Sequence, residues 1–229
     1  MKKKRLALLL PAMVIPFIGA LFYFILYKDS KVVQLLYMGT KFFTLFWPVL
    51  VYFALGNMKE FDFFAKLKPQ KKPVMAGLIF GILLIICMLG LMETPIGDIV
   101  TAGGTAMKDK VIALGISSWY WPFALFISLI HSLLEEYYWR WFVYGQLRKI
   151  VPISFAHILG GVSFAAHHLV ITSQYFPMGW AVFFASAVGI GGMIWSILYE
   201  KHGTLVGVWI CHIFADLVIF WVGYQVIFV

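Results

Sequence analysis

The chain has 229 residues, of which 62% are hydrophobic and only 12% charged, and its mean hydropathy is +0.92. Soluble domains are about 45–50% apolar and about 25% charged, so a soluble globule of this composition would lack the polar residues needed to cover its surface. The net charge of +8 would suggest nucleic acid in a soluble protein. Here the basic residues lie in short segments between apolar runs, which is typical of membrane proteins in contact with anionic lipid. We therefore expect the lipid bilayer, and no nucleic acid, as a partner.

Apolar runs long enough to cross a bilayer recur along the chain and predict an all-α, polytopic transmembrane bundle. About seven spans are expected, near residues 6–27, 36–56, 74–92, 117–147, 155–173, 178–199 and 204–227. The first follows a basic flank and ends in bulky aromatics, so we interpret it as a retained span and not as a signal peptide. The second begins with an amphipathic stretch, from Lys31 to Lys41, that is typical of the membrane interface. The segment 93–116 is rich in Gly, Thr and charge and is predicted to be a loop with a short interfacial helix.

The distribution of Lys and Arg between these spans predicts the orientation of the chain. With the N-terminus inside, the inner segments hold Lys2, Lys3, Lys4, Arg5, Lys59, Lys66, Lys68, Lys71, Lys72, Arg148, Lys149 and Lys201, and the outer segments hold Lys28, Lys31, Lys108 and Lys110. This is a clear positive-inside bias. We expect a multi-pass protein of a bacterial or archaeal plasma membrane, with a cytoplasmic N-terminus. Residues 1–229 are interpreted as a single integral membrane domain.

Ionisable residues inside a span cost roughly 2.5–3.5 kcal/mol on insertion scales, so each one needs an explanation. Glu135 and Glu136 lie about 18 Å from the basic inner end of their span, near mid-bilayer. Arg140 follows Glu136 by one helical turn, where an ion pair is geometrically natural. Glu135 points about 100° away, and the residue that could face it is His131, four residues earlier. Taken alone, the motif fits a structural Glu–Arg pair as well as a functional acid.

Two further clusters bring histidines into the spans that follow. His167 and His168 are adjacent and face different directions, and Phe164 shares the face of His168. His212 and Asp216 are four residues apart and share a face near the end of the chain. Each cluster alone is explained by helix–helix hydrogen bonding. Because all three can reach similar depth, we expect chemistry or ion transport where they converge, among the C-terminal four spans.

The available side chains suit hydrolysis without a covalent intermediate. A buried carboxylate can take a proton from water, and imidazole groups can share that water, bind a metal or stabilise an oxyanion. The sequence has neither GxSxG nor HExxH, and Ser132 and Ser163 lack a recognisable motif context.

The three clusters resemble the three motifs of the CPBP family, the CAAX-processing and bacteriocin-processing intramembrane proteases. That family carries EExxxR on one span, FxxxH on the next, and HxxxN or a variant near the end. The corresponding segments here are EEYYWR at 135–140, FAAHH at 164–168 and HIFAD at 212–216. Their order and spacing match over roughly residues 117–220, which would be the protease core, with the N-terminal spans, 1–92, as accessory elements.

The resemblance implies roles for the first two motifs. Glu135 is expected to be the base that activates water, assisted by His168. Glu136 and Arg140 are expected to form a supporting pair, with Phe164 as a further supporting residue. The FxxxH spacing selects His168 over its neighbour, His167.

The resemblance also implies a role for the third motif. His212 and Asp216 would form the oxyanion site or complete a metal site. Position 216 holds Asp where the family often has Asn, and an ionised Asp cannot donate to an oxyanion. The family has been described both as metal-dependent and as glutamate-type, so a divalent metal such as zinc on Glu135, His168 and His212 stays open beside a metal-free mechanism.

These observations favour an intramembrane endopeptidase that acts on a membrane-associated protein or peptide. Two other classes stay open. One is a non-enzymatic immunity or adaptor protein in which the polar cluster is structural. The other is a proton-coupled transporter, which inverted repeats or a pair of broken helices would favour.

Overall fold

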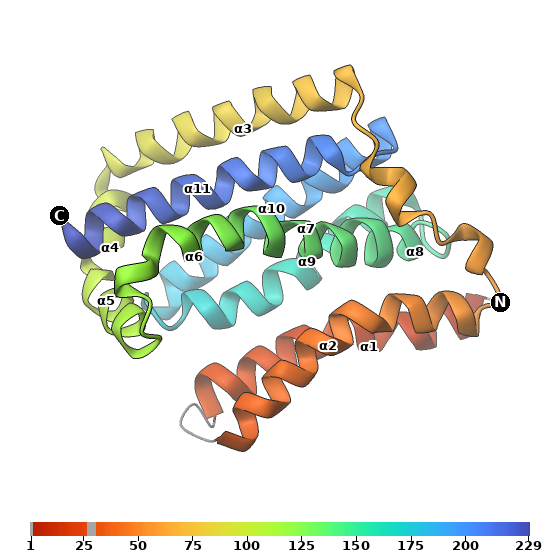
Figure 1. Ribbon diagram of the computed structural model, residues 1–229, viewed down its shortest axis with the longest axis horizontal. Coiled ribbons are helices and arrows are strands. Elements are labelled where there is room, and N and C mark those ends of the chain that lie inside the picture. Colours follow the sequence, from red (N-terminus) through yellow and green to blue (C-terminus); the bar gives the residue numbers. More distant parts are fainter. Residues whose placement is uncertain (1, 27–30) are drawn as a thin grey trace.

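The computed structural model describes residues 2–26 and 31–229, and the regular elements in these ranges are all helical (Figure 1), which confirms the all-α prediction. The elements are α1 (Lys2–Leu21), η1 (Phe22–Leu26), α2 (Lys31–Ala54), η2 (Met58–Glu60), η3 (Phe63–Leu67), α3 (Lys71–Met92), α4 (Pro95–Ala102), α5 (Gly104–Ala113), η4 (Ser117–Trp119), α6 (Tyr120–Phe126), η5 (Ile127–His131), α7 (Ser132–Glu135), η6 (Glu136–Tyr144), α8 (Gly145–Leu147), α9 (Ile153–Thr172), α10 (Met178–His202) and α11 (Val206–Phe228).

Five helices of the described chain are long and apolar enough to cross a membrane, namely α1 with η1, α3, α9, α10 and α11. A sixth is counted if α4–α5 and the long helix Ser117–Leu147, which meet at 95°, form one bent span. The expected second span corresponds to α2, in which Met38–Ala54 forms a shorter apolar helix among the described residues. The predicted membrane bundle is therefore confirmed, with five or six spans by length and composition against about seven expected.

The segment 93–116, predicted as a loop with a short helix, contains the two helices α4 and α5. The Oγ1 atom of Thr94 accepts a hydrogen bond from the Ile96 N–H at 3.3 Å, and Pro95 occupies the first turn. This cap and a proline at the first turn favour helix initiation. Gly115, with a φ of 66°, lies just beyond the end of α5. Local capping therefore makes this polar segment more helical than its composition suggested.

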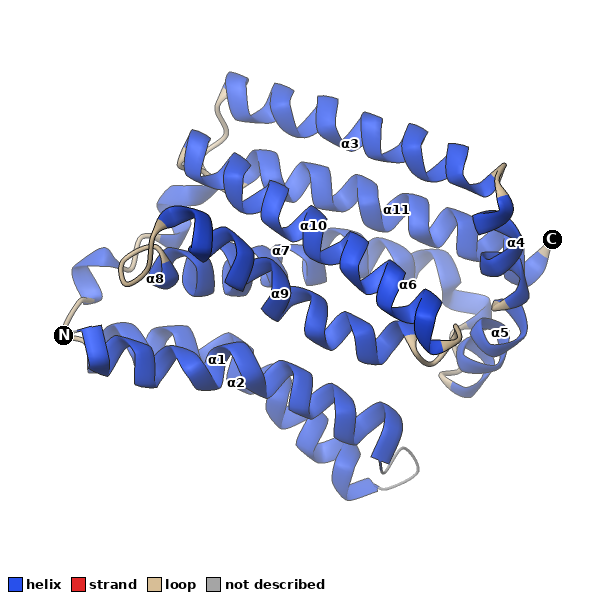
Figure 2. Ribbon diagram, turned by 180° about the vertical axis from the view of Figure 1, so that it is seen from behind, coloured by secondary structure: helices blue, strands red, loops and turns tan. Residues whose placement is uncertain are grey.

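The helices form layers around the long helix Ser117–Leu147 (Figures 1 and 2). α3 lies on the outside against α11, while α9 packs side by side with α10, which also contacts α11 and α3. Glycines permit the close approach, since a Cβ atom at Gly77 of α3 would overlap the carbonyl group of Gly207 of α11. Small residues at helix crossings are typical of membrane bundles, where van der Waals packing drives association.

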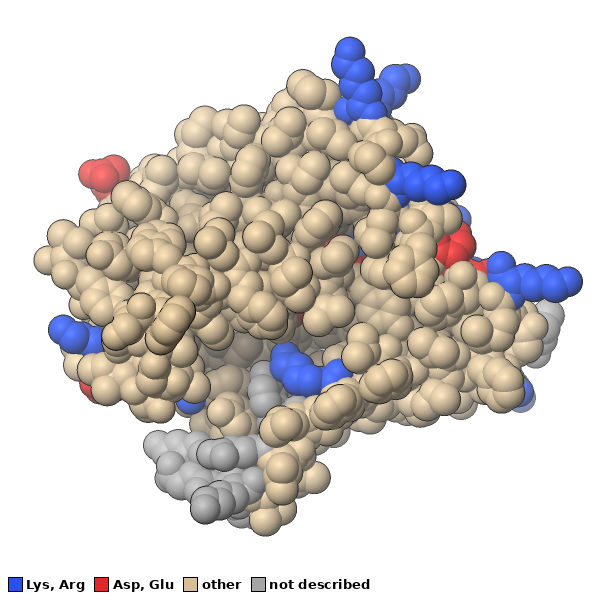
Figure 3. Space-filling model, viewed as in Figure 1, with Lys and Arg blue, Asp and Glu red and all other residues tan. Residues whose placement is uncertain are grey.

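The α1–α2 hairpin lies against one side of this bundle and diverges from it away from the N-terminal end (Figures 1 and 2). Two tyrosines of the long helix attach it. Tyr138 donates a hydrogen bond to the Ala12 carbonyl at 2.7 Å, and Tyr137 donates one to the Leu45 carbonyl at 2.9 Å. The hairpin is therefore held by backbone acceptors, and Figure 3 shows a hollow between it and the bundle.

Candidate active site

The helix that carries the first motif alternates between α and π geometry. Residues 127–131 and 136–144 are π-helical, with the short α7 between them. π-helical turns are rare and occur frequently at functional sites. Glu135 and Glu136 lie at the junction where α7 passes into η6. Nothing in the hydrophobic pattern signalled these turns, because a π-turn changes the register of a helix without changing its composition.

The predicted pair between Glu136 and Arg140 is present and fully buried. Arg140 Nε lies 3.3 Å from Glu136 Oε2, and the side chains are 1% and 0% exposed. The guanidinium carbon lies 4.2 Å from the ring centre of Phe164 and 4.8 Å from that of Trp195. Phe164 thus supports the pair through its ring face, and Trp195 is a partner that the motif comparison did not name.

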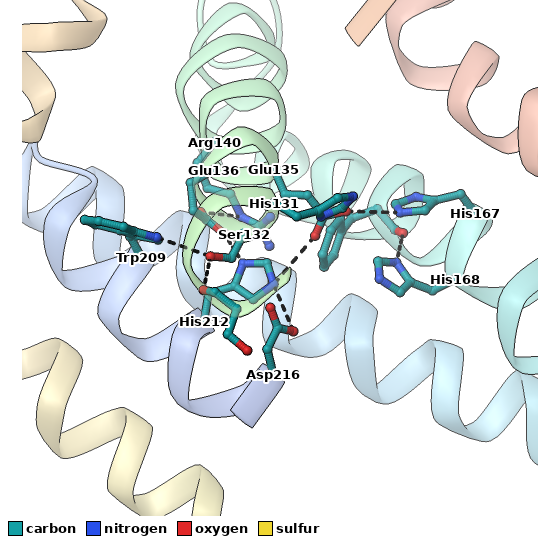
Figure 4. Close-up of polar contacts among 12 residues, drawn as sticks. His131, Ser132, Glu135, Glu136, Arg140, His167, His168, Trp209, His212 and Asp216 are labelled. Carbon is teal, nitrogen blue, oxygen red and sulfur yellow. Dashed lines mark hydrogen bonds and ion pairs between the residues drawn. The ribbon is translucent and has the colours of Figure 1, made fainter. Parts of the chain in front are cut away.

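His212 connects the two glutamates (Figure 4). Its Nδ1 lies 2.6 Å from Glu136 Oε1, and its Nε2 lies 3.6 Å from Glu135 Oε2 and 3.7 Å from Asp216 Oδ1. Its ring stacks on Trp195, with centres 4.3 Å apart. A short hydrogen bond at one ring nitrogen fixes the orientation of the other, so Glu136 directs Nε2 of His212 toward Glu135.

Both histidines of α9 approach Glu135. His167 Nε2 lies 3.6 Å from Glu135 Oε1, and the His167 ring stacks on Trp139 with an interplanar angle of 3°. His168 Nδ1 lies 2.9 Å from the Phe164 carbonyl oxygen, which leaves its Nε2 for a ligand or water. The motif spacing selected His168 alone. The structure adds His167, which only the three-dimensional position of Glu135 could reveal.

Three of these groups have an arrangement that suits a divalent metal. One ligand atom each from Glu135, His167 and His168 lies within 4.8 Å of the other two. Two imidazoles and a carboxylate are a common donor set for catalytic zinc. The expected set contained His212 in place of His167, and Nε2 of His212 also lies 3.6 Å from Glu135 Oε2. Among the described residues, the three groups whose ligand atoms all lie within 4.8 Å of one another are nevertheless Glu135, His167 and His168.

His131 lies on the same side of the site as Glu135, as its spacing along the helix suggested (Figure 4). The contact seen at its Nε2 is with Nζ of Lys41 in α2, at 3.4 Å. Lys41 was noted in the sequence only as the end of an amphipathic stretch.

A cavity of about 510 Å³ joins these groups to the hollow between the hairpin and the bundle. It is lined by α1, α2, the long helix, α9 and α11, mostly with apolar side chains. The predicted or newly found site residues on its wall are Glu135, His167, His168, His212 and Asp216. Glu136 and Arg140 lie behind them and are sealed from the cavity. The accessory hairpin therefore forms one wall of the site.

Ser132 lies near the site but its hydroxyl is engaged on both sides. Its Oγ donates to the Ser128 carbonyl at 2.5 Å and accepts from Nε1 of Trp209 at 3.2 Å. The bond to Trp209 joins the long helix to α11, and the bond to Ser128 lies within the long helix. Together they give Ser132 a role in packing.

The comparison with protein families supports this grouping. Residues 117–218 match the family described as Type II CAAX prenyl endopeptidase Rce1-like. Residues 117–218 are a CPBP-family domain. The matched range of this Rce1-like domain begins at the long helix and ends just after Asp216, so it contains all three motifs. Searches of curated proteins and of solved structures find no match to this chain.

Proposed function

We propose that this chain is an intramembrane endopeptidase that hydrolyses a peptide bond of a membrane-associated protein or peptide. The observation that carries the proposal is the convergence of Glu135, His168 and His212, from three different helices, on one wall of a cavity within the helical bundle. A structural Glu–Arg pair would explain Glu136 but gives no reason for Glu135 to face a cavity. The match to a family of proteases supports the same conclusion.

In the proposed mechanism, Glu135 is the general base. Its carboxylate accepts a proton from a water molecule as the water oxygen attacks the carbonyl carbon of the scissile bond. His168 Nε2 accepts a hydrogen bond from the other hydrogen of that water, which aligns the water and stays on its oxygen. As the carbon–nitrogen bond breaks, Glu135 returns the proton to the leaving nitrogen. The products are a free carboxylate and a free amine, and no covalent intermediate forms.

His212 is the proposed donor to the oxyanion of the tetrahedral intermediate. Its Nε2 lies within 4 Å of carboxylate oxygens of Glu135 and Asp216. Glu136 holds the opposite nitrogen at 2.6 Å. A donor fixed in this way needs no reorganisation when negative charge develops on the substrate, which is the usual source of electrostatic catalysis. Asp216 acts by keeping His212 protonated and oriented, and does not itself donate.

The triad of Glu135, His167 and His168 also fits a divalent metal. When bound, such an ion would lower the pKa of a coordinated water and polarise the substrate carbonyl. The residue roles then shift, because Glu135 and both histidines become ligands. Metal content measured on active protein, with His167→Ala compared with His202→Ala near the membrane boundary, distinguishes the two forms of the proposal.

The decisive experiment uses purified protein in lipid nanodiscs with a panel of labelled peptides, including farnesylated and unprenylated CAAX peptides. Cleavage is followed by mass spectrometry, which locates the cut. We expect turnover that Glu135→Gln and His168→Ala each abolish while the helical circular dichroism and thermal unfolding remain unchanged. Full activity in either variant contradicts the role assignment. Retained biological function in both would favour an adaptor.

We further propose that the N-terminus is cytoplasmic. Figure 3 shows most basic side chains at the end of the bundle where the chain begins. Positive charge in short loops favours the cytoplasmic side. Labelling of single cysteines introduced at Lys72 and Lys108 from outside intact cells tests this, with only the second expected to react.

A further inference from the structure

The end of the bundle at which the chain begins carries an excess of basic side chains (Figure 3). Three carboxylates lie at this end, and each is already paired with a basic side chain. The pairs, with nitrogen–oxygen distances of 2.5–3.2 Å, are Lys149–Glu60, Lys66–Asp62 and Arg148–Glu200. The remaining cations of this end therefore need counter-ions from outside the chain.

Four of these remaining cations gather where α3 begins and α10 ends. They are Lys68, Lys71, Lys72 and Lys201, and all four are exposed. We call them the α3–α10 patch. Within residues 2–26 and 31–229, no ion pair engages any of the four, because the carboxylates of this end are paired elsewhere. Figure 3 shows basic side chains projecting from the end of the bundle where α3 begins.

The turn between α10 and α11 holds the patch together. Thr204 Oγ1, in this turn, donates a hydrogen bond to the Lys66 carbonyl at 2.6 Å and lies 3.4 Å from the Lys68 carbonyl oxygen. Pro73 packs so closely on α11 that a Cβ atom at Gly207 would overlap its carbonyl group. The three lysines that precede Pro73 and the one in the last turn of α10 are therefore brought to the same place.

The patch lies where apolar helix surfaces meet their first charges. Below it, Met75 and Ile79 of α3 and Ile197 of α10 are exposed. Phe64, in the segment that leads to α3, is 77% exposed. Lysines next to exposed aromatic and aliphatic side chains are typical of segments at the boundary between lipid headgroups and acyl chains. The four ammonium groups are therefore placed at the level of the lipid phosphates.

The chemistry of the patch favours an anionic phospholipid over an acidic peptide. Lysine ammonium groups bind phosphate as compact point charges. Each lysine near an anionic membrane surface strengthens binding about five-fold. An acidic peptide would reach the charges from the aqueous side and leave the apolar surfaces below them without a partner, whereas a phospholipid matches both.

We propose that the α3–α10 patch binds the phosphate headgroup of an anionic phospholipid, whose acyl chains lie along the exposed surfaces of α3 and α10. The site is separate from the cavity that contains Glu135, and it does not depend on the proposed function. Because α11 begins at the turn beside the patch, a lipid bound there should stabilise the folded bundle.

Native mass spectrometry of the purified chain, in detergent micelles titrated with one lipid at a time, counts the bound molecules and gives Kd. The probes are dioleoyl phosphatidylglycerol, which is anionic, and dioleoyl phosphatidylcholine, which has the same acyl chains and no net charge. We expect the anionic lipid to bind at least ten-fold more tightly. The variant Lys68→Gln/Lys71→Gln/Lys72→Gln should lose this preference, and the variant with Arg at the same three positions should retain it.

The matched control removes the same charge from the same end of the molecule. Its substitutions are Lys2→Gln, Lys3→Gln and Lys59→Gln, all at exposed lysines. Two of these lie in α1, which Figure 1 shows across the bundle from α3. The control should keep the preference for phosphatidylglycerol. An equal loss in the control would mean that diffuse net charge attracts the lipid, and would overturn the inference.

Three other results would also overturn it. They are equal affinity of the wild-type protein for the two lipids, a preference that survives the triple Gln substitution, and displacement of the lipid by an equimolar soluble competitor. The competitors are glycerophosphoglycerol, the headgroup without acyl chains, and polyglutamate, an acidic peptide. Neither should displace the lipid. No step of the assay needs catalysis, so an inactive protein would contradict the proposed function and leave this result standing.

Thermal unfolding in the same micelles provides a second readout. Phosphatidylglycerol should raise the unfolding midpoint of the wild-type protein as its concentration rises, because it binds the folded state. The triple Arg variant should show the same rise, and the triple Gln variant should show none. Circular dichroism before heating confirms that each variant is folded. A rise of equal size in the triple Gln variant contradicts binding at the patch.

Discussion

Replacement of Glu136 by Gln tests whether the buried pair holds the site together. The substitution keeps the shape of the side chain and removes its charge. Arg140, 1% exposed, would then remain inside the bundle without its carboxylate. The ring faces of Phe164 and Trp195 would still contact the guanidinium, and such contacts contribute about 0.5–2 kcal/mol.

We expect Glu136→Gln to lower the free energy of unfolding by about 3–5 kcal/mol, which is typical when one partner of a buried pair is removed. The matched control is the pair between Lys149 and Glu60, at 2.5 Å but with side chains 36% and 49% exposed. Because solvent screens an exposed pair, Glu60→Gln should cost only about 0–1 kcal/mol. The expected difference between the two substitutions comes from burial and not from distance, because the exposed Lys149–Glu60 pair is shorter than the buried Arg140–Glu136 pair.

The double variant Glu136→Gln/Arg140→Met removes both charges and should recover much of the loss. Unfolding of all variants is followed by circular dichroism during denaturation in mixed micelles, and the cycle gives the coupling energy of the pair. A coupling of roughly 2 kcal/mol or more supports the argument. Additive losses, or a Glu136→Gln variant no less stable than Glu60→Gln, would refute it.

Two further substitutions test the packing that positions the site. Gly77→Ala should destabilise the α3–α11 contact by about 1–3 kcal/mol, because its Cβ overlaps backbone, whereas Gly90→Ala on the same helix meets open space and should be neutral or slightly stabilising in thermal unfolding. Trp195→Leu removes the ring stacked on His212 and should lower kcat about ten-fold, equivalent to about 1.4 kcal/mol. Helical content should be unchanged, and an unaffected kcat would show that the stacking does not position the imidazole.

Hydropathy was sufficient for most of the fold because a bilayer demands long apolar helices whose backbone groups are satisfied internally. It predicted α3, α9, α10 and α11 closely. It was less accurate for 93–116, where the capping group of Thr94 starts a helix in a polar sequence. The divergence of the hairpin from the bundle has no periodic signal, because it depends on tertiary hydrogen bonds.

The site was predictable where its contacts are local. The Glu136–Arg140 pair spans one turn of a single helix, so spacing alone indicated it. The contacts of His167 with Glu135 and of Lys41 with His131 cross between helices distant in the sequence. Neighbouring positions on one helix do not determine which residue of another helix faces them. The π-turns at 127–131 and 136–144 add a further register change that no spacing rule includes.

The position of Asp216 beside His212 suggests why an Asp can replace the Asn that is common at this position. Its Oδ1 lies 3.7 Å from Nε2 of His212, the nitrogen opposite the one held by Glu136. An Asn there could donate to an oxyanion directly. In the proposed mechanism, an Asp would instead favour the imidazolium form of His212, whose Nε2 proton would then be the donor. Under the proposed mechanism, the site therefore lacks the second oxyanion donor that an Asn would provide, but the donor that remains, His212, carries a full positive charge. Glu136 and Asp216 balance that charge from the two nitrogens of the ring.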